Sequence, residues 1–412
     1  MVPKGWSSVQ AQDVCKSISV GVVIKPTQYY VPEGYGVKAF RSANVREGFI
    51  NDSDWVYFSH EGHAINKKSH LKTGDVLIVR TGYPGTACVV TPEFEGSNAI
   101  DIVIARPDMD KIIPEYLCAY TNSHIGKSQV LDLQGGMAQK HLNGGAYQVL
   151  KINLPPLREQ KKIAQILSTW DKAITVTEKL LANSQQQKKA LMQQLVTGKK
   201  RLLDENGVRF SGEWKRVKLG AIADMNSGGT PKSTVEEYYG GNIPWVSISD
   251  MTSNGKWIAT TEKYLTELGL NSSSARIYPK NSVLYAMYAS IGECSIAAVN
   301  LTSSQAILGI RPKDCLNYEF LYFYLTSLKE KIKLQGQQGT QSNLNAGMVK
   351  EFELDLPSIR EQQKIAAVLS AADAEISTLE KKLACLRDEK KALMQQLLTG
   401  KRRVKVDEAV AE

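Results

Sequence analysis

Residues 154–201 read LPPLREQKKIAQILSTWDKAITVTEKLLANSQQQKKALMQQLVTGKKR, and residues 356–403 read LPSIREQQKIAAVLSAADAEISTLEKKLACLRDEKKALMQQLLTGKRR. The two segments align without a gap at an offset of 202 positions and are identical at 28 of 48 positions. Such agreement between distant parts of one chain indicates an internal duplication, which divides the 412-residue sequence into two comparable halves.

Each copy has the pattern of one long helix that buries a narrow apolar stripe. Apolar residues recur at alternating steps of four and three, which is the heptad spacing of a coiled coil. The apolar seam consists of Ile163, Leu167, Trp170, Ile174, Leu181, Leu191 and Leu195 in the first copy and of Ile365, Leu369, Ala372, Ile376, Leu379, Leu383, Leu386, Leu393 and Leu397 in the second. Its polar positions are Thr177, Ser184, Lys188 and Lys390. Proline precedes both helices, Ser358 and Glu361 form a capping-box pattern, and a Thr-Gly pair ends each helix.

A helix of this kind, roughly 60 Å long, needs a partner for its seam, and the other copy is the obvious one. Two equal units packed face to face prefer a two-fold relation, which makes the helices antiparallel. A helical hairpin or a dimerisation coil is the alternative for a single such stretch. We therefore predict two α/β (α+β) heads joined by two long antiparallel coiled-coil helices in a pseudo-two-fold arrangement. The predicted segments are a first head (1–153), a first spacer helix (154–203), a second head (204–355), a second spacer helix (356–405) and an acidic tail (406–412).

The positive charge of the chain, a formal net charge of +9, lies on the two helical segments rather than on the heads. Basic clusters such as residues 199–201 and 401–403 are typical of surfaces that meet a phosphate backbone. They equally suit helix C-termini, where they complement the helix dipole. The sequence shows no apolar run long enough to span a membrane and no signal peptide, and its six cysteines are scattered. These features favour a cytoplasmic protein with reduced thiols.

Both heads show short strand-like runs separated by glycine, proline and asparagine, followed by a short helical stretch, around residues 114–122 in the first head, and a Gly/Gln-rich loop. The second head repeats this plan with little identity: Val283 corresponds to Val76 and Gly292 to Gly85, both at an offset of 207. The helical segments have therefore stayed alike while the heads have diverged. This pattern suits heads that perform different versions of one task.

With these features the chain resembles, over its whole length, the DNA-sequence-specificity (S) subunit of type I restriction-modification systems. The resemblance rests on the LPP-x-R-E-Q-K-x-I-A type of opening and the ALMQQL-x-TGK close of the helical segments. In the second head, Gly229-Thr230-Pro231 and Pro244-Trp245 also resemble the recognition-domain signature of that family. The first head lacks both of these motifs.

The resemblance implies a non-catalytic subunit in which each head is a target-recognition domain that reads one half of a bipartite, asymmetric target in double-stranded DNA. The helices would fix the gap between the halves and dock two copies of a methyltransferase (modification) subunit. It implies no cofactor in this chain, with S-adenosylmethionine in the methyltransferase subunit. Restriction (motor-nuclease) subunits, where the system has them, would bring ATP and Mg. The implied location is the cytoplasm of a bacterium or archaeon.

Side chains that read base edges are Arg or Lys for guanine, Asn or Gln for adenine, and apolar groups for the thymine methyl. The Gly/Gln-rich loops supply such groups, and an ordinary surface loop is the alternative. The candidates in the first head are Arg41, Arg80, Tyr83, Gln134, Gln139, Lys140, His141 and Asn143. Those in the second head are Lys232, Ser233, Ser249, Tyr285, Tyr288, Gln337, Gln338, Thr340, Gln341, Ser342, Asn343 and Asn345. Lys232 and Ser233 suit a phosphate contact, whereas Tyr285 and Tyr288 lie in a strand-like run that equally suits a core.

Enzyme motifs are missing from the sequence. The adenine methyltransferase tetrad Asn/Asp-Pro-Pro-Tyr/Phe does not occur, and no G-x-G-x-x-G follows a strand. His60, His63 and His70 suggest a metal site, but no cysteine accompanies them, which favours a polar loop without metal. The alternatives to a type I specificity subunit are a scaffold whose heads bind proteins, an enzyme with an unrecognised site, and a specificity subunit of another methyltransferase-based defence system.

Overall fold

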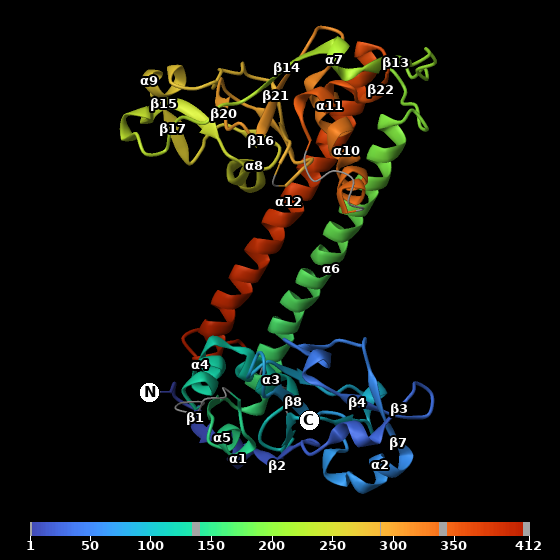
Figure 1. Ribbon diagram of the computed structural model, residues 1–412. Helices are drawn as coiled ribbons and strands as arrows, with labels where there is room; N and C mark the ends of the chain where they lie inside the picture. Colours follow the sequence, from blue (N-terminus) through green and yellow to red (C-terminus); the bar gives the residue numbers. More distant parts are fainter. Residues whose placement is uncertain (1, 134–140, 289, 338–343, 407–412) are drawn as a thin grey trace. The chain divides into compact units, whose positions relative to one another are not determined.

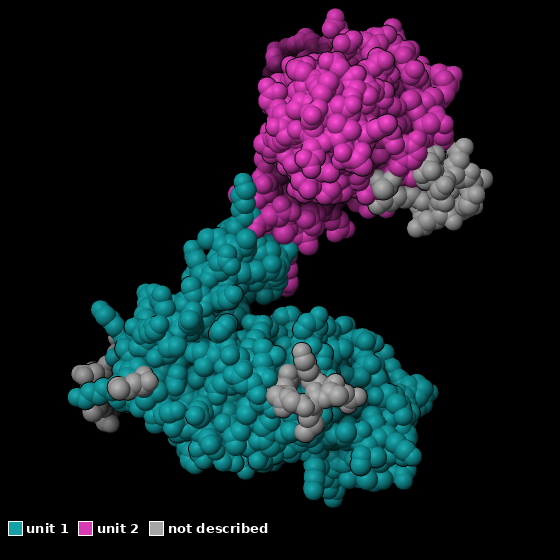
Figure 2. All heavy atoms as spheres, turned by 60° about the vertical axis from the view of Figure 1, so that its left-hand side comes forward, with its two compact units in different colours: residues 1–178, 381–412 teal, residues 179–380 magenta. Residues whose placement is uncertain are grey.

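The computed structural model describes residues 2–133, 141–288, 290–337 and 344–406. The chain divides into two compact units, coloured separately in Figure 2. Unit 1 comprises Met1–Glu178 and Lys381–Glu412, whereas unit 2 comprises Lys179–Glu380. Unit 1 is therefore assembled from both ends of the sequence, and unit 2 from one continuous stretch. Each unit contains one head and about half of each long helix.

The two long helices are α6 (Leu157–Val196) and α12 (Ile359–Leu398), each 40 residues in length (Figure 1). Both are followed by a glycine in the left-handed conformation, Gly198 with φ 69° and Gly400 with φ 70°. A residue with a Cβ is strained in this conformation, which explains the Thr-Gly pair at each helix end. No helix of the described residues is long and apolar enough to cross a membrane.

Within each unit the two helices run antiparallel. In unit 1, Asp171 pairs with Lys390 and Glu178 with Arg387, so that rising numbers on α6 meet falling numbers on α12. Unit 2 has the corresponding pair Lys188–Asp373. The lysines at polar seam positions thus meet aspartates of the other helix. Every residue of the predicted apolar seam is buried or half-buried, which confirms the heptad prediction.

The first head contains two four-stranded sheets, with strand orders β2-β11-β8-β9 and β10-β4-β7-β3, and the small pairs β1-β12 and β5-β6. Its strands are β1 (Ser7–Gln10), β2 (Cys15–Val20), β3 (Tyr30–Val31), β4 (Gly36–Phe40), β5 (Val45–Arg46), β6 (Phe49–Ile50), β7 (Val56–Ser59), β8 (Val76–Val79), β9 (Ala87–Val89), β10 (Asn98–Ala99), β11 (Ile102–Pro107) and β12 (Lys151–Leu154). Its helices are α1 (Ala11–Val14), η1 (Pro26–Tyr29), η2 (Ser42–Asn44), α2 (His60–Ile65), η3 (Lys67–Ser69), η4 (Pro92–Phe94), α3 (Pro114–Asn122), α4 (His124–Leu133) and α5 (Gly144–Gln148).

The second head repeats this plan with a five-stranded sheet, β14-β21-β18-β19-β16, a three-stranded sheet, β17-β15-β20, and the pair β13-β22. Its strands are β13 (Lys215–Lys218), β14 (Ala223–Ser227), β15 (Tyr239–Val246), β16 (Trp257–Ile258), β17 (Lys263–Leu265), β18 (Val283–Ala286), β19 (Cys294–Ala297), β20 (Thr302–Ser303), β21 (Ile307–Pro312) and β22 (Glu353–Leu356). Its helices are α7 (Leu219–Ile222), η5 (Glu236–Tyr238), α8 (Ile248–Asn254), α9 (Glu267–Asn271), α10 (Tyr318–Gln337) and α11 (Ala346–Lys350). The mixed heads and paired helices confirm the predicted fold class.

Each head shares its main hydrophobic core with both long helices. In unit 1, Ile163 of α6 and Leu397 of α12 belong to the same cluster as Val103 of the central sheet. A buried glutamine near the start of each long helix also forms a hydrogen bond with the backbone of the head. Gln160 accepts a hydrogen bond from the backbone N–H of Ile113 at 3.0 Å. Gln362 accepts the corresponding bond from Asn317 at 2.8 Å.

The six cysteines are all free thiols, as the scattered spacing predicts. Burial raises the pKa of Cys15 and of Cys88 to about 12, so that both stay protonated near neutral pH.

A carboxylate at the start of each long helix joins three parts of its unit. In unit 1, Glu159 accepts hydrogen bonds from Trp6 Nε1 of the head at 3.2 Å and from Arg403 Nε, beyond the end of α12, at 3.0 Å. The guanidinium of Arg403 also lies over the Trp6 ring. The head, α6 and the segment after α12 therefore meet at one buried charge.

Unit 2 repeats this arrangement with Glu361, Trp214 Nε1 at 3.1 Å and Arg201 Nη2 at 2.8 Å. The predicted capping box at the start of α12 forms only in part. The N–H of Glu361 donates to Ser358 Oγ at 3.3 Å, but the Glu361 carboxylate bonds to Arg201 and Trp214 instead of returning to the cap. The sequence pattern cannot reveal this competition because Arg201 lies 160 residues away.

We expect Arg403→Ala to lower the free energy of unfolding of unit 1 by roughly 1–3 kcal/mol, because the buried Glu159 carboxylate loses its cation. Arg201→Ala has the corresponding effect on unit 2. Chemical denaturation of the full chain measures the change. Arg402→Ala, an exposed neighbour with the same charge, is the control. Equal stability of Arg403→Ala and Arg402→Ala would show that the carboxylate does not need its guanidinium.

Candidate nucleic-acid interface

Several loops of the first head emerge from one edge of its central sheet. The last residue of β2, Val20, pairs with Val103 near the start of β11. The last residue of β8, Val79, pairs with Ile102, the first residue of β11, so that both strands end at the same edge of the sheet. The loop that precedes α5 returns to this edge through the N–H of Leu142, which donates to the Arg80 carbonyl at 3.0 Å. The loop after β2, the β8–β9 turn and the end of the Gly/Gln-rich loop are therefore neighbours.

The second head places its corresponding loops at the corresponding edge. Strand β14 ends at Ser227, which pairs with Leu308, and β18 ends at Ala286, which pairs with Ile307. The N–H of Leu344 donates to the Met287 carbonyl at 3.0 Å, as Leu142 does in the first head. We call this edge of each central sheet the loop edge.

A glycine fixes the course of the loop after the first sheet strand in both heads. A Cβ on Gly21 would lie 2.2 Å from the Ala99 carbonyl oxygen, and a Cβ on Gly228 would lie 2.2 Å from that of Ser303. Only glycine allows the backbone to pass this closely. The two glycines therefore occupy equivalent positions.

Counting onward from these glycines aligns Lys25 with Lys232, and both lysines are exposed. Lys232 is among the predicted candidates, but Lys25 is not. The signal for Lys25 is the offset of 207 that also relates Gly85 to Gly292. Lys25 has φ 45°, a left-handed conformation that costs a non-glycine residue on the order of 1–3 kcal/mol and that is common at functional sites.

The turn after β4 in the first head and that after β15 in the second also reach the loop edge. The Phe40 carbonyl accepts a bond from Ile100 at 2.8 Å, and the Val246 carbonyl accepts the corresponding bond from Ser304 at 2.9 Å. The predicted candidate Arg41 directly follows β4, and the candidate Ser249 lies three residues after the end of β15. Ser249 is exposed on α8.

The guanidinium of Arg41 is partly occupied within its own head. Its Nη2 lies 3.0 Å from Asp54 Oδ2. Arg41 therefore contributes less free charge to the loop edge than its sequence position suggests.

Two predicted DNA contacts prove to be structural residues. Arg80 forms an ion pair with Asp101, donates from Nε to the Leu142 carbonyl at 2.8 Å and leaves only 11% of its side chain exposed. Arg80 thus joins the end of β8 to the segments that carry Asp101 and Leu142, and its side chain does not face solvent. Tyr285 is fully buried and packs against Phe352, and burial raises the pKa of its hydroxyl. Its place in the core removes it from the candidates.

The other candidates within the described residues differ in how far their side chains are exposed to solvent. Tyr83 in the β8–β9 turn is 83% exposed and Tyr288 in the β18–β19 turn is 39% exposed. Ser233 is exposed beside Lys232, and His141 is half-buried. The remaining candidates Gln134, Gln139, Lys140, Gln338, Thr340, Gln341, Ser342 and Asn343 lie outside the described residues, and Gln337 is described only as the last residue of α10.

Asn143 and Asn345 are exposed helix caps. The Asn143 side chain accepts a bond from Ala146 N–H at 2.6 Å, and the Asn345 side chain accepts one from Met348 N–H at 3.0 Å. Each asparagine therefore anchors the end of its loop to a short helix.

The histidine-rich segment of the first head is held by local contacts. The rings of His63 and His70 stack at 3.8 Å, His63 Nδ1 lies 2.6 Å from Asn98 Oδ1, and His70 Nε2 lies 2.7 Å from the His63 carbonyl. Among the described residues, no group of three or more His, Cys, Asp or Glu residues is placed to hold a metal ion.

Comparison with known proteins identifies the family. The family model of the type I restriction modification DNA specificity domain matches the chain twice, at residues 3–183 and 211–386. The chain belongs to this family, and it functions as a DNA sequence-specificity subunit of a type I restriction-modification system, as the sequence resemblance predicts.

Individual relatives match the chain over nearly its whole length. The type I restriction enzyme MjaVIII specificity subunit of Methanocaldococcus jannaschii is 27% identical over 427 residues, which cover 98% of this chain and 94% of the relative. The fold resembles that of the type I restriction-modification system S subunit from M. genitalium, with a TM-score of 0.58, 14% identity and 96% coverage of both chains. A solved structure that describes the assembly and conformational transition of the type I R-M system matches with a TM-score of 0.62, 19% identity, and 98% and 100% coverage.

We expect Lys25→Ala and Lys232→Ala each to weaken binding to any duplex DNA roughly threefold and to reduce the salt dependence of binding by about one counterion. Phosphate contacts carry charge but no sequence information, so both target and non-target duplexes are affected. Fluorescence anisotropy over a range of salt concentrations measures the effect. Lys72→Ala and Lys280→Ala, exposed lysines before β8 and β18 at the opposite sheet edge, are the controls. Equal losses in controls and test variants would place the phosphate contacts elsewhere.

Proposed function

We propose that each head reads one half of a bipartite, asymmetric target in double-stranded DNA through its loop edge. The observation that supports this proposal is the recurrence of the same loop edge, with an equivalent exposed lysine, in both heads. Equivalent surfaces suit two half-sites on one duplex. Lys25 and Lys232 contact phosphate, whereas the exposed Tyr83, Tyr288 and Ser249 lie among the groups that reach bases.

Differences between the loop edges support an asymmetric target. Ile24 is 80% exposed, whereas Pro231 at the equivalent position is buried. Tyr83 in the β8–β9 turn is 83% exposed, whereas the exposed residue at the equivalent position is Ser290. Side chains that differ in shape and polarity read different base edges. The two heads therefore specify different half-sites.

The long helices α6 and α12 set the number of base pairs between the half-sites and dock two copies of a methyltransferase subunit. The chain itself is non-catalytic and binds no cofactor. S-adenosylmethionine belongs to the methyltransferase subunit, which methylates adenine, and ATP and Mg belong to two restriction subunits where the system has them. The complex works in the cytoplasm of a bacterium or archaeon, where the DNA lies. The absence of methyltransferase and nucleotide-binding motifs from the sequence supports this division.

We expect deletion of the gene to erase adenine methylation from one split motif, two short specific halves separated by a fixed gap. Single-base mapping of the methylome with the gene present and deleted measures this. Replacement of residues 1–153 by the first head of another family member is expected to change one half of the motif only. Loss of no motif, although the protein and the methyltransferase subunit are expressed, would favour a scaffold that does not specify sequence.

A further inference from the structure

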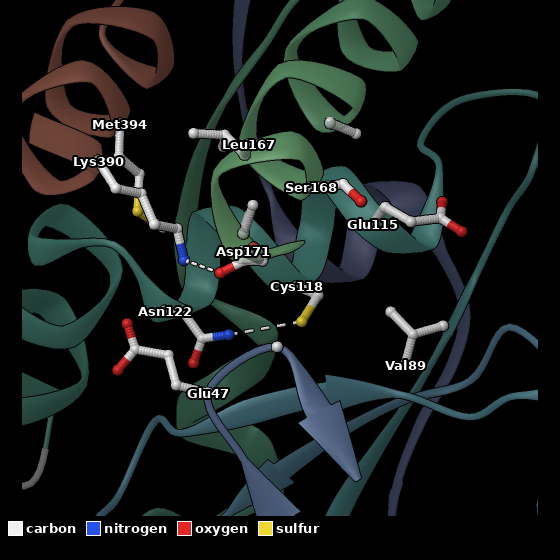
Figure 3. A pocket seen from close by; sticks show the side chains of 13 residues that line it. Glu47, Val89, Glu115, Cys118, Asn122, Leu167, Ser168, Asp171, Lys390 and Met394 are labelled. Carbon is white, nitrogen blue, oxygen red and sulfur yellow. Dashed lines mark hydrogen bonds and ion pairs between the residues drawn. The ribbon is translucent and has the colours of Figure 1, made fainter. Parts of the chain in front are cut away.

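A cavity of about 170 Å³ in unit 1 lies where α3 of the head meets α6 and α12 (Figure 3). Its lining includes the carboxylates Glu47, Glu115 and Asp171, the ammonium group of Lys390, and the small side chain of Cys118. A more open hollow of about 390 Å³ shares Glu115 with the cavity and extends along α6. The cavity volume is several times the ~30 Å³ that one water molecule occupies in the liquid, so an amino-acid side chain fits in it.

The cavity lining carries three carboxylates and one ammonium group. Asp171 pairs with Lys390, as Figure 3 shows, and Glu47 pairs with Lys127 at 2.6 Å. Glu115 forms no ion pair with any of the described residues. The acidic lining repels phosphate and leaves Glu115 available to a cation.

The duplicated half shows what these groups bind. The matching hydrogen bonds of Gln160 and Gln362 align α3 with α10 and place Glu115 opposite Glu319. The offset of 202 between the long helices places Asp171 opposite Asp373 in the same way. The carboxylates of the cavity therefore have counterparts in unit 2.

In unit 2 a lysine of the head occupies the corresponding place. Lys256 Nζ donates to Ser370 Oγ at 2.8 Å and lies 3.2 Å from Glu319 Oε1 and 3.9 Å from Asp373 Oδ2. The same ammonium group lies 4.5 Å from the centre of the Phe323 ring. This combination of carboxylates, a hydroxyl and an aromatic face is a binding site for a cationic side chain.

Unit 1 has the same carboxylates but lacks both the lysine and the large aromatic side chains that surround it in unit 2. Cys118 and Ala119 stand where unit 2 has Tyr322 and Phe323. The segment beside β9 carries Glu47, whereas the segment beside β19 carries Lys256. The cavity of unit 1 thus corresponds to the site that Lys256 fills in unit 2. In unit 1 the segment that would supply the lysine supplies the carboxylate of Glu47 instead.

We propose that the unit 1 cavity binds a lysine or arginine side chain of the methyltransferase subunit. The inference rests on the proposed docking of that subunit on the long helices. Glu115 bonds the incoming cation as Glu319 bonds Lys256, and the space beside Ala119 holds its aliphatic stem. Unit 2 closes the same site with its own lysine. The two docked copies of the methyltransferase subunit are therefore held by different contacts.

The test titrates the full chain with the methyltransferase subunit of the same system. Isothermal titration calorimetry measures the two affinities, and native mass spectrometry counts the bound copies. We expect Glu115→Gln to weaken one of the two binding steps about tenfold, because a charge-assisted hydrogen bond is lost, and to leave the other step unchanged. Ala119→Phe, which fills the cavity with the side chain used in unit 2, is expected to weaken the same step. Thermal unfolding verifies that this variant is folded.

Glu93→Gln is the matched control, since it removes the same charge from an exposed position of the first head. It is expected to leave both steps unchanged. Wild-type affinities for both copies in Glu115→Gln and in a folded Ala119→Phe would overturn the inference while leaving the proposed function intact. A wild-type chain that binds no methyltransferase subunit would overturn the proposed docking itself, and the inference with it.

Discussion

Each unit of the molecule depends on one buried carboxylate at the start of a long helix. Glu159 and Glu361 each accept hydrogen bonds from a tryptophan of the head and from an arginine just beyond the end of the other long helix. A buried charge is tolerated only when it is paired and hydrogen-bonded. The head, the helix and the returning segment must therefore be present together, and the position of the head on the helix pair is fixed.

The junction and the loop edge follow different constraints within the same head. At the junction the carboxylate, the arginine, the tryptophan and the buried glutamine recur in both units because they meet one another. At the loop edge, glycine recurs where the backbone passes another carbonyl, as at Gly21 and Gly228. Glycine also recurs in the next turn, where Gly85 and Gly292 both have a positive φ. The residues that follow at equivalent positions differ in their surroundings, since Ile24 is exposed and Pro231 is buried. No shared contact requires the same residue type at this position in both heads. A frame that both units share can thus carry loop surfaces that differ between the two heads.

The parts of the fold that follow from local or periodic patterns could be predicted from the sequence. The heptad seam, the glycines that end the helices and the helix at residues 114–122 are of this kind, and the structure confirms them. The residues that sequence reasoning misplaced are decided by distant partners. Arg80 has the chemistry of a guanine contact, yet Asp101 and the Leu142 carbonyl bind its guanidinium. All four residues of β18, Tyr285 among them, are buried. The strand therefore shows no alternation of buried and exposed residues from which the burial of Tyr285 could be predicted.

The composition of unit 1 from both ends of the chain has a consequence for biosynthesis. Its core includes Leu397 and Leu398, and Arg403 also donates to the Lys4 carbonyl at 3.0 Å. A ribosome releases these residues after all of unit 2, long after the first head has emerged. Unit 2, by contrast, is continuous in sequence, so all of its contacts become available before translation ends. The unit whose synthesis begins first is therefore completed after the other, and premature termination near residue 390 leaves an intact unit 2 and a first head that lacks part of its core.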